Sequence, residues 1–181
     1  EQRYKYLPGI LAGEIWCQGF SEPNAGSDLA SLKTRAERRG DRYVINGQKI
    51  WSTMAQYADR CLLLARSGKS GPPQAGLAYL LLDMRSKGVS VRPISQITGD
   101  DEFAEIFFDD VEVPVEDLVG KEGEGWAVAQ ATLASERGLT LVELSQRMRY
   151  ALPLLGAAMR DAGRRDGGPG GLNHEQRKGL A

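Results

Sequence analysis

Alternation of polar and apolar residues between positions 31 and 53 limits this segment to a β-sheet with one buried face. The stretch reads SLKTRAERRGDRYVINGQKIWST, and a period of two places every second side chain on the same face of a strand. Two turn signals interrupt it, Arg39-Gly40-Asp41 and Asn46-Gly47. Because Asn-Gly supplies the two positive φ angles of a tight hairpin, the pattern predicts a three-stranded meander.

Four further strands are predicted downstream, followed by one long helix. RCLLLARS and GLAYLLLDM are short apolar runs that cross a sheet core, and VSVRPISQI and FAEIFFDDVEVP follow, the last ended by Pro114. After the glycine-rich VGKEGEG, apolar residues recur at three and four from Trp126 to about Met159. This period predicts a helix with a kink or break at Pro153.

These signals predict three parts and an α+β fold that is mainly β. Residues 1–13 are interpreted as the end of a preceding helical element that closes at Pro8-Gly9, and residues 14–125 as the β-domain. Residues 126–181 are interpreted as the start of an incomplete helical domain, with a flexible connection, GRRDGGPGG, at 163–171. The expected architecture is an antiparallel β-barrel or two-sheet sandwich followed by a long, kinked helix. The chain is interpreted as a piece of a longer protein, because it begins without methionine and stops in a helix-like stretch.

Charge and hydropathy argue against several classes of partner. The net charge is −1, from 23 basic and 24 acidic residues, which gives no electrostatic footprint for nucleic acid or for an anionic membrane. No run approaches the roughly 18 apolar residues of a membrane span, and no targeting segment opens the chain. A cytoplasmic location, or the mitochondrial matrix, is therefore expected.

Cysteine and histidine usage gives little support for metal or triad chemistry. Cys17 and Cys61 lie far apart in the sequence with apolar neighbours, which predicts two buried, reduced thiols. The single histidine, His174, sits in a polar tail with no other ligand type close by. We therefore expect no metal site.

The segment GFSEPNAGSD, residues 19–28, holds more glycine, proline and small hydroxyl residues than a turn needs. Strands lie about 4.8 Å apart, so this loop and the strand end KIWST, residues 49–53, are predicted to meet at one rim of the sheet. Ser21, Ser27 and Thr53 would then lie close to the indole of Trp51. An indole and hydrogen-bond donors suit a planar ring edged with acceptors, such as an isoalloxazine or a purine.

Two long motifs resemble the acyl-CoA dehydrogenases. WCQGFSEPNAGSDLASLKTRAERRGDRYVINGQKIWST resembles the start of the central β-domain of these flavin-dependent enzymes, and FFDDVEVPVEDLVGKEGEGW resembles its last strand and exit. The likeness runs from about Pro8 to Arg137. It implies FAD as cofactor, an acyl-CoA substrate, an electron-transfer flavoprotein as electron acceptor, and a homo-oligomer in the full-length form.

The resemblance also implies site residues. The cofactor-binding positions would be Gln18, Phe20, Ser21, Ser27, Trp51, Ser52 and Thr53. Among these, Ser21 would bond the pyrimidine edge of the flavin, and Thr53 would direct its hydroxyl at flavin N5. Ser27 would also touch the thioester ligand, and Arg137 would lie near its pantetheine or nucleotide part.

The reaction implied is α,β-dehydrogenation of an acyl thioester, in which a carboxylate removes the α-proton and the β-hydrogen leaves as hydride to N5. Glu136 is a candidate base, because some branches of the family carry the base at that position; in most members it lies beyond the end of this chain. Two alternatives stay open: an acyl-CoA oxidase on the same scaffold, and a non-catalytic β-domain that binds a nucleotide or protein. Residues 1–181 alone are expected to be inactive.

Overall fold

The structure is a computed structural model that describes residues 1–68 and 71–165. Its helices and strands, in chain order, are α1 (Gln2–Leu11), β1 (Trp16–Gly19), β2 (Arg35–Arg39), β3 (Arg42–Thr53), β4 (Arg60–Arg66), β5 (Leu77–Asp83), β6 (Val89–Ile94), β7 (Phe103–Pro114) and α2 (Gly125–Arg165). The predicted flexible connection begins inside α2, and its remainder, together with His174, lies outside the described residues.

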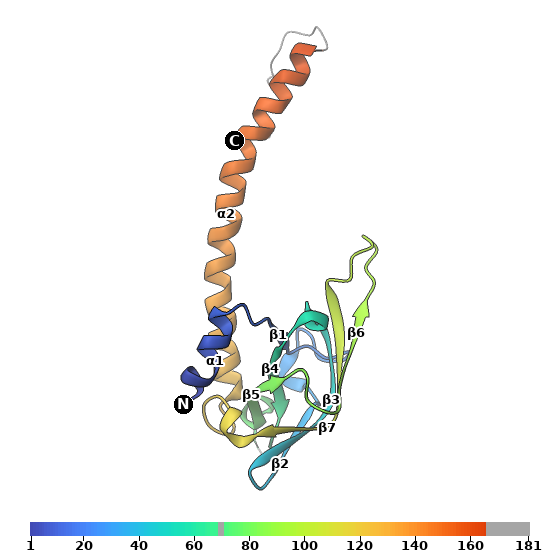
Figure 1. Ribbon diagram of the computed structural model, residues 1–181, viewed down its shortest axis with the longest axis vertical. Coiled ribbons are helices and arrows are strands. Elements are labelled where there is room, and N and C mark those ends of the chain that lie inside the picture. Colours follow the sequence, from blue (N-terminus) through green and yellow to red (C-terminus); the bar gives the residue numbers. More distant parts are fainter. Residues whose placement is uncertain (69–70, 166–181) are drawn as a thin grey trace. The chain divides into compact units, whose positions relative to one another are not determined.

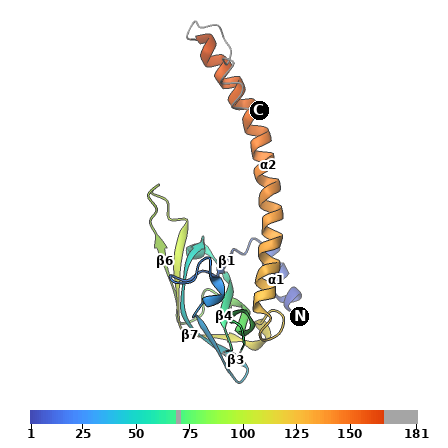
Figure 2. The same cartoon turned by 180° about the vertical axis from the view of Figure 1, so that it is seen from behind.

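The strands form one curled, mostly antiparallel sheet. Their order is β1-β4-β2-β3-β7-β6, and β5 pairs with β4 on its other side. The strands curl into an open half-barrel (Figures 1 and 2). Two pairings are parallel, β1 with β4 and β2 with β4, which the sequence pattern did not predict. The predicted fold class, mainly β with a long C-terminal helix, is confirmed.

The hydrophobic core fills the inside of this curled sheet. Alternate residues of the strands point inward and are almost fully buried, so the period of two read from the sequence is the period of the core. The largest fully buried apolar side chains of this core are Tyr43, Ile45, Leu63, Leu80, Leu82, Ile106, Val111 and Val113. The described positions of β4, β5, β6 and β7 agree with the four predicted strands.

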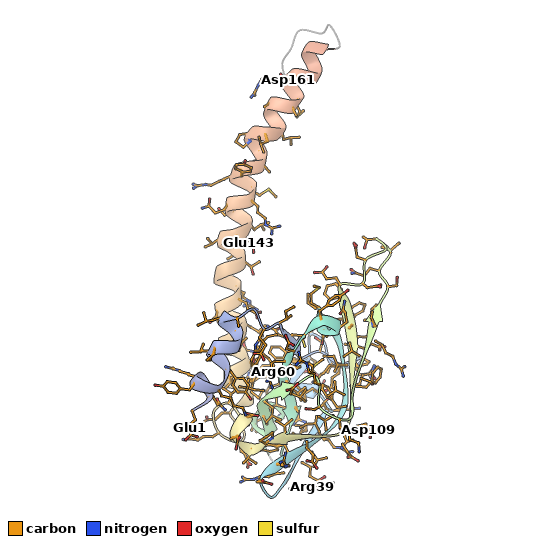
Figure 3. The ribbon with its side chains drawn as sticks, in the orientation of Figure 1. Glu1, Arg39, Arg60, Asp109, Glu143 and Asp161 are labelled. Atoms are coloured by element: carbon orange, nitrogen blue, oxygen red, sulfur yellow. The ribbon has the colours of Figure 1, made fainter. Side chains whose placement is uncertain are left out.

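The predicted three-stranded meander is wrong at its second turn. Gly40 and Asp41 do connect β2 to β3, and Arg39 lies at the tip of that hairpin (Figure 3). Asn46 and Gly47, however, lie inside β3, which runs unbroken from Arg42 to Thr53. The long strand β7 pairs with β3 on both sides of this dipeptide, so the ladder continues where the sequence predicted a reversal.

Helix α1 packs against the segment that follows β7. The side-chain amide of Gln2 donates to the carbonyl oxygens of Glu116 and Leu118, at 2.7 and 2.8 Å. Lys5 pairs with Asp117 at 2.8 Å. The helix continues through Pro8 to Leu11, so the predicted end at Pro8-Gly9 is corrected. A proline near the end of a helix removes one hydrogen bond, which the packed helix tolerates.

Helix α2 spans both compact units of the chain, Glu1–Ala131 and the residues from Thr132 onward. Its start packs closely on β5, because a Cβ at Gly125 would lie 2.6 Å from the carbonyl oxygen of Leu77. The helix passes through Pro153, so the predicted break is absent. The domain boundary predicted between residues 125 and 126 stays a prediction. No described helix is long and apolar enough to cross a membrane.

Candidate functional site

The loop after β1 and the last part of β3 lie side by side, as the rim hypothesis requires. The main-chain N–H of Ile50 donates to the carbonyl oxygen of Ser21 at 2.9 Å. The ammonium of Lys49 donates to the carbonyl oxygen of Phe20, also at 2.9 Å. The loop at Phe20 and Ser21 and the end of β3 are therefore neighbours, and we call residues 18–27 and 51–53 the rim.

A β-bulge directs the side chains at the end of β3. Lys49 pairs with Ile106 and Ser52 with Ala104, so β3 holds one extra residue between these two pairs. At this bulge Trp51 has a left-handed φ of 60°. Its indole is 58% exposed and meets the ring of Phe103 edge-on, with centroids 6.0 Å apart. The bulge thus explains how a tryptophan in a strand becomes a flat surface at the rim.

Three hydroxyl side chains of the rim are available to a ligand. Ser27 and Thr53 are exposed and Ser21 is half-buried. Within the described part of the chain, none of the three hydroxyls donates to a protein acceptor. Together with the exposed indole, this set fits the acceptor-rich edges and the flat face of an isoalloxazine.

The other predicted contacts lie deeper in the protein. The Phe20 side chain is 7% exposed and packs on the ring of Tyr79, so only its main chain is available. Gln18 is half-buried and already interacts with other residues. The hydroxyl of Ser52 is buried on the core side and has no hydrogen-bond partner among the described residues. A ligand contact at Ser52 would therefore go through its main chain.

A buried ion pair that sequence reasoning missed supports the rim from below. Lys49 is 0% exposed and lies 2.9 Å from the carboxylate of Glu22. Burial lowers the pKa of Lys49, and Glu22 only partly offsets that effect. Burial also opposes ionisation of Glu22, but Lys49 and the hydrogen bonds from Thr34 and Lys33 outweigh it and lower the pKa of this carboxyl.

A signal for this pair was present in the sequence. Counting in steps of two from the inward residues Tyr43 and Ile45 reaches Lys49, which places a lysine on the core face of β3. A lysine at such a position requires a buried acidic partner. The turn predicted at Asn46-Gly47 reset the count and hid this signal.

A groove of about 770 Å³ lies beside β2. The first of its lining residues in the sequence is Ser31, four residues after Ser27. Among the described residues, four cationic and two acidic side chains line it. Arg39 is held by Glu37 at 3.0 Å, and Arg66 donates to main-chain carbonyls. Lys33 and Arg35 form no ion pair with a described residue, so their charge is available to an anion.

Glu136 and Arg137 lie on α2, in the second compact unit. Both side chains are exposed. The main-chain carbonyl of Glu136 accepts a hydrogen bond from the Thr140 hydroxyl at 3.0 Å. The structure brings the two segments of the rim together. The roles predicted for Glu136 and Arg137 stay predictions.

The two cysteines are buried, as predicted, and they are neighbours. Cys17 and Cys61 face each other in the parallel ladder between β1 and β4. A hydrogen bond with Cys17, together with burial, raises the pKa of Cys61 well above its usual value. Among the described residues, no group of acidic, cysteine or histidine side chains is arranged to hold a metal ion.

Comparison with known proteins points to one family. Residues 17–111 match the family model described as acyl-CoA dehydrogenase, middle domain. Acyl-CoA dehydrogenase IpdE1 of Mycolicibacterium smegmatis is 48% identical over 162 residues, which cover 83% of this chain and 41% of that protein. The chain therefore spans about two-fifths of that relative's length.

Two solved structures share the fold. A structure titled Tcur3481-Tcur3483 steroid ACAD has a TM-score of 0.80 at 36% identity, covering 92% of this chain and 42% of that one. The ChsE4-ChsE5 complex from Mycobacterium tuberculosis has a TM-score of 0.68 at 39% identity, covering 74% of this chain and 34% of that one. The matched residues include the loop after β1 and all of β3, where the rim lies. This chain belongs to the acyl-CoA dehydrogenase family and contains its middle domain.

Proposed function

We propose that the protein containing this chain catalyses the α,β-dehydrogenation of an acyl-CoA thioester with bound FAD. Acyl-CoA dehydrogenases are flavoproteins, and the family match covers the residues of the rim. The observation that supports the proposal most is the convergence of the Ser21 loop and the Trp51–Thr53 strand end, which the Ile50 to Ser21 hydrogen bond fixes. FAD, when bound, supplies the hydride acceptor at N5.

Each rim residue has a task in this proposal. Ser21 holds the pyrimidine edge of the flavin through its N–H and hydroxyl, with Gln18 and the main chain of Phe20 beside it. Trp51 covers one face of the ring, and the main chain of Ser52 continues that contact. The exposed hydroxyl of Thr53 addresses N5. Because Trp51 and Thr53 are already exposed at the rim, little reorganisation of these two side chains is needed when a planar ligand binds.

Residues outside the ring contact complete the proposed reaction. Ser27 binds both the flavin and the thioester ligand, Arg137 lies toward the pantetheine or nucleotide part, and Glu136 is the candidate base. An electron-transfer flavoprotein is the proposed acceptor. We also propose an oligomer, since both neighbouring structures described above carry two-component names.

The function is tested on the native protein that contains this chain. We expect it to purify with FAD and to lose flavin absorbance when a substrate is added without oxygen. Straight-chain, branched and steroid-derived acyl-CoA are the substrates to compare, the last because a solved relative is titled a steroid ACAD. Thr53→Ala is expected to slow flavin reduction about tenfold, because one hydrogen bond of about 1.4 kcal/mol to N5 is lost as charge develops there.

The control for Thr53→Ala is Thr98→Ala, which removes an exposed hydroxyl from the loop between β6 and β7. Stopped-flow reduction rates should be unchanged in this control. Native protein without flavin would contradict the proposal and favour a non-catalytic binding module. Rapid release of hydrogen peroxide in air, with no transfer to an electron-transfer flavoprotein, would identify an oxidase instead.

We further propose that the groove beside β2 binds the phosphorylated nucleotide end of coenzyme A. Ser31, at the end of the short helix η1 (Leu29–Ser31), lines the groove and follows closely after Ser27. A thioester ligand held at Ser27 can therefore extend along the chain into a groove with two cations, Lys33 and Arg35, that pair with no described carboxylate. Guanidinium groups are well suited to phosphate recognition.

Arg35→Gln is the test of this groove. The KM for an acyl-CoA should rise about tenfold, equivalent to about 1.4 kcal/mol, while the KM for the matching acyl-pantetheine, which lacks the nucleotide, stays constant. Arg92→Gln is the matched control, because Arg92 is exposed on β6 and does not line the groove. An equal rise for both substrates would place the effect of Arg35 elsewhere.

A further inference from the structure

Lys49 holds the loop that is proposed to bind the flavin, although its own side chain cannot reach a ligand at the rim. It is 0% exposed, and its ammonium contacts the carbonyl oxygen of Phe20 and the carboxylate of Glu22, each at 2.9 Å. The lysine therefore lies under the loop, on the core side of β3.

The geometry of the peptide bond links this contact to the rim. In a trans peptide the C=O of one residue and the N–H of the next point in opposite directions. Since the Phe20 carbonyl points to Lys49, the N–H of Ser21 points away from it. The same rule applies one residue later, where the Ser21 carbonyl accepts from Ile50 and the Glu22 N–H donates to Ala25 on the other side.

Ser21 thus presents an N–H that is left for a ligand and whose peptide group contacts Lys49. Within the described residues it donates to no protein acceptor, whereas the N–H of Glu22 is used at 3.0 Å. A cation on the oxygen of a peptide group draws electron density from the nitrogen and makes its N–H a stronger donor. Lys49 therefore both orients and polarises the Phe20–Ser21 peptide.

Glu22 keeps this cation in place. Its carboxylate accepts from Lys49 and from the main-chain N–H groups of Lys33 and Thr34, at 2.6 and 2.8 Å. All of these bonds lie on the side of the loop away from the Ser21 N–H. The carboxylate thus neutralises Lys49 without competing for the donor that Ser21 presents.

We propose that Lys49 is a positioning residue that raises the reduction potential of the bound flavin through the Ser21 N–H. The inference rests on the function proposed above. Reduction increases the negative charge at the pyrimidine edge of the flavin, so a stronger donor there binds the reduced form more tightly than the oxidised form. A purely structural lysine would change stability and FAD content, but not the ratio of these two affinities.

The test measures the flavin midpoint potential of the native protein and of Lys49→Met, which keeps an unbranched side chain one atom shorter and removes the charge. We expect the reduced flavin to bind about tenfold more weakly relative to the oxidised flavin, a drop of about 30 mV for a two-electron couple. If Lys49→Met does not fold, the double variant Lys49→Met/Glu22→Gln is measured, because it leaves no buried carboxylate without a cation.

Lys5→Met is the control, because it also breaks a lysine–carboxylate pair, the one with Asp117 at 2.8 Å, outside the rim. Its midpoint potential should equal that of the native protein. An unchanged potential in the Lys49 variants would overturn the inference and leave the proposed function standing. Native protein with no bound flavin would overturn both.

Discussion

Glu22→Ala is expected to lower the free energy of unfolding by about 3–5 kcal/mol. The substitution leaves the fully buried ammonium of Lys49 without a counter-charge. It also removes the acceptor of two main-chain N–H groups, those of Lys33 and Thr34. Urea unfolding of the chain, followed by circular dichroism, measures the loss.

The loss of folding stability in Glu22→Ala should become smaller as the pH rises. Burial lowers the pKa of Lys49 below 10.5, and without Glu22 nothing comparable raises it again. The unfolded chain then binds more protons than the folded chain, so stability rises with pH between the lowered pKa and 10.5. The parent gains stability in the same way only above its own, less lowered pKa of Lys49, so the deficit should shrink as the pH is raised from the variant's pKa of Lys49 to the parent's.

Glu37→Ala is the matched control. Glu37 also pairs with a cation, Arg39, at 3.0 Å, but both side chains are at least 60% exposed. An exposed pair of this kind contributes about 0–1 kcal/mol. Equal losses in Glu22→Ala and Glu37→Ala would contradict the account of Glu22 and Lys49 as a buried pair.

Much of the fold is predictable because its strands carry local signals. The apolar runs at β4 and β5 and the proline that ends β7 needed no knowledge of their partners, and the positions of these strands agree with the structure. The parallel pairing of β1 and β2 with β4 was not predictable. It depends on which strand edges meet after the chain has curled, and single strands carry no such information.

Part of the candidate site was predictable for a different reason. The residue types of the rim suggested a planar ligand. The sequence predicted two chain reversals before the end of β3, but a single one, between β2 and β3, brings the loop after β1 and the end of β3 together. The outward turn of Trp51 was not predictable, because it depends on a bulge in the ladder between β3 and β7. Lys49 was missed because the turn predicted at Asn46-Gly47 hid its place on the core face, and Glu22 was missed because a contact across 27 residues leaves no mark in local spacing.

Proline illustrates the limit of local rules in the helices. Pro153 was expected to kink or break α2; the described helix passes through it and ends at Arg165, so there is no break, and the kink stays a prediction. A proline removes one hydrogen bond and crowds the preceding turn, a cost that a helix can bear at one position. The cost is local, so the neighbouring turns continue the helix on both sides.

Asn46-Gly47 was interpreted as a turn, although the same dipeptide can also stand inside a strand beside a bulge of the neighbouring strand. The extra residue in this part of the ladder belongs to β7, where Asp110 has a φ of 47°. The Asn46 amide caps it, donating to the Asp110 carboxylate at 2.8 Å and accepting from the Asp110 N–H at 3.0 Å. Asparagine therefore serves a bulge on the neighbouring strand and not a turn of its own.

Gly47→Ala is accordingly expected to destabilise the chain by about 3 kcal/mol, the sum of overpacking and backbone strain. A Cβ at this position would lie 2.7 Å from the Cα of Thr34, a main-chain atom that cannot turn aside as a side chain can. The φ of Gly47, +151°, is also one that residues with a side chain rarely adopt. Thermal unfolding of the chain measures the effect.

Gly26→Ala separates this steric cost from the general cost of replacing glycine. Gly26 lies in the rim loop, a Cβ there would meet nothing within 4 Å, and its φ is not in the positive range. Its unfolding temperature should change little or rise slightly, because alanine restricts the unfolded chain. If Gly47 instead occupied a hairpin turn, no contact with Thr34 would exist and Gly47→Asn would be tolerated. A stable Gly47→Asn variant would therefore contradict the continuous strand on which the position of Trp51 and Thr53 depends.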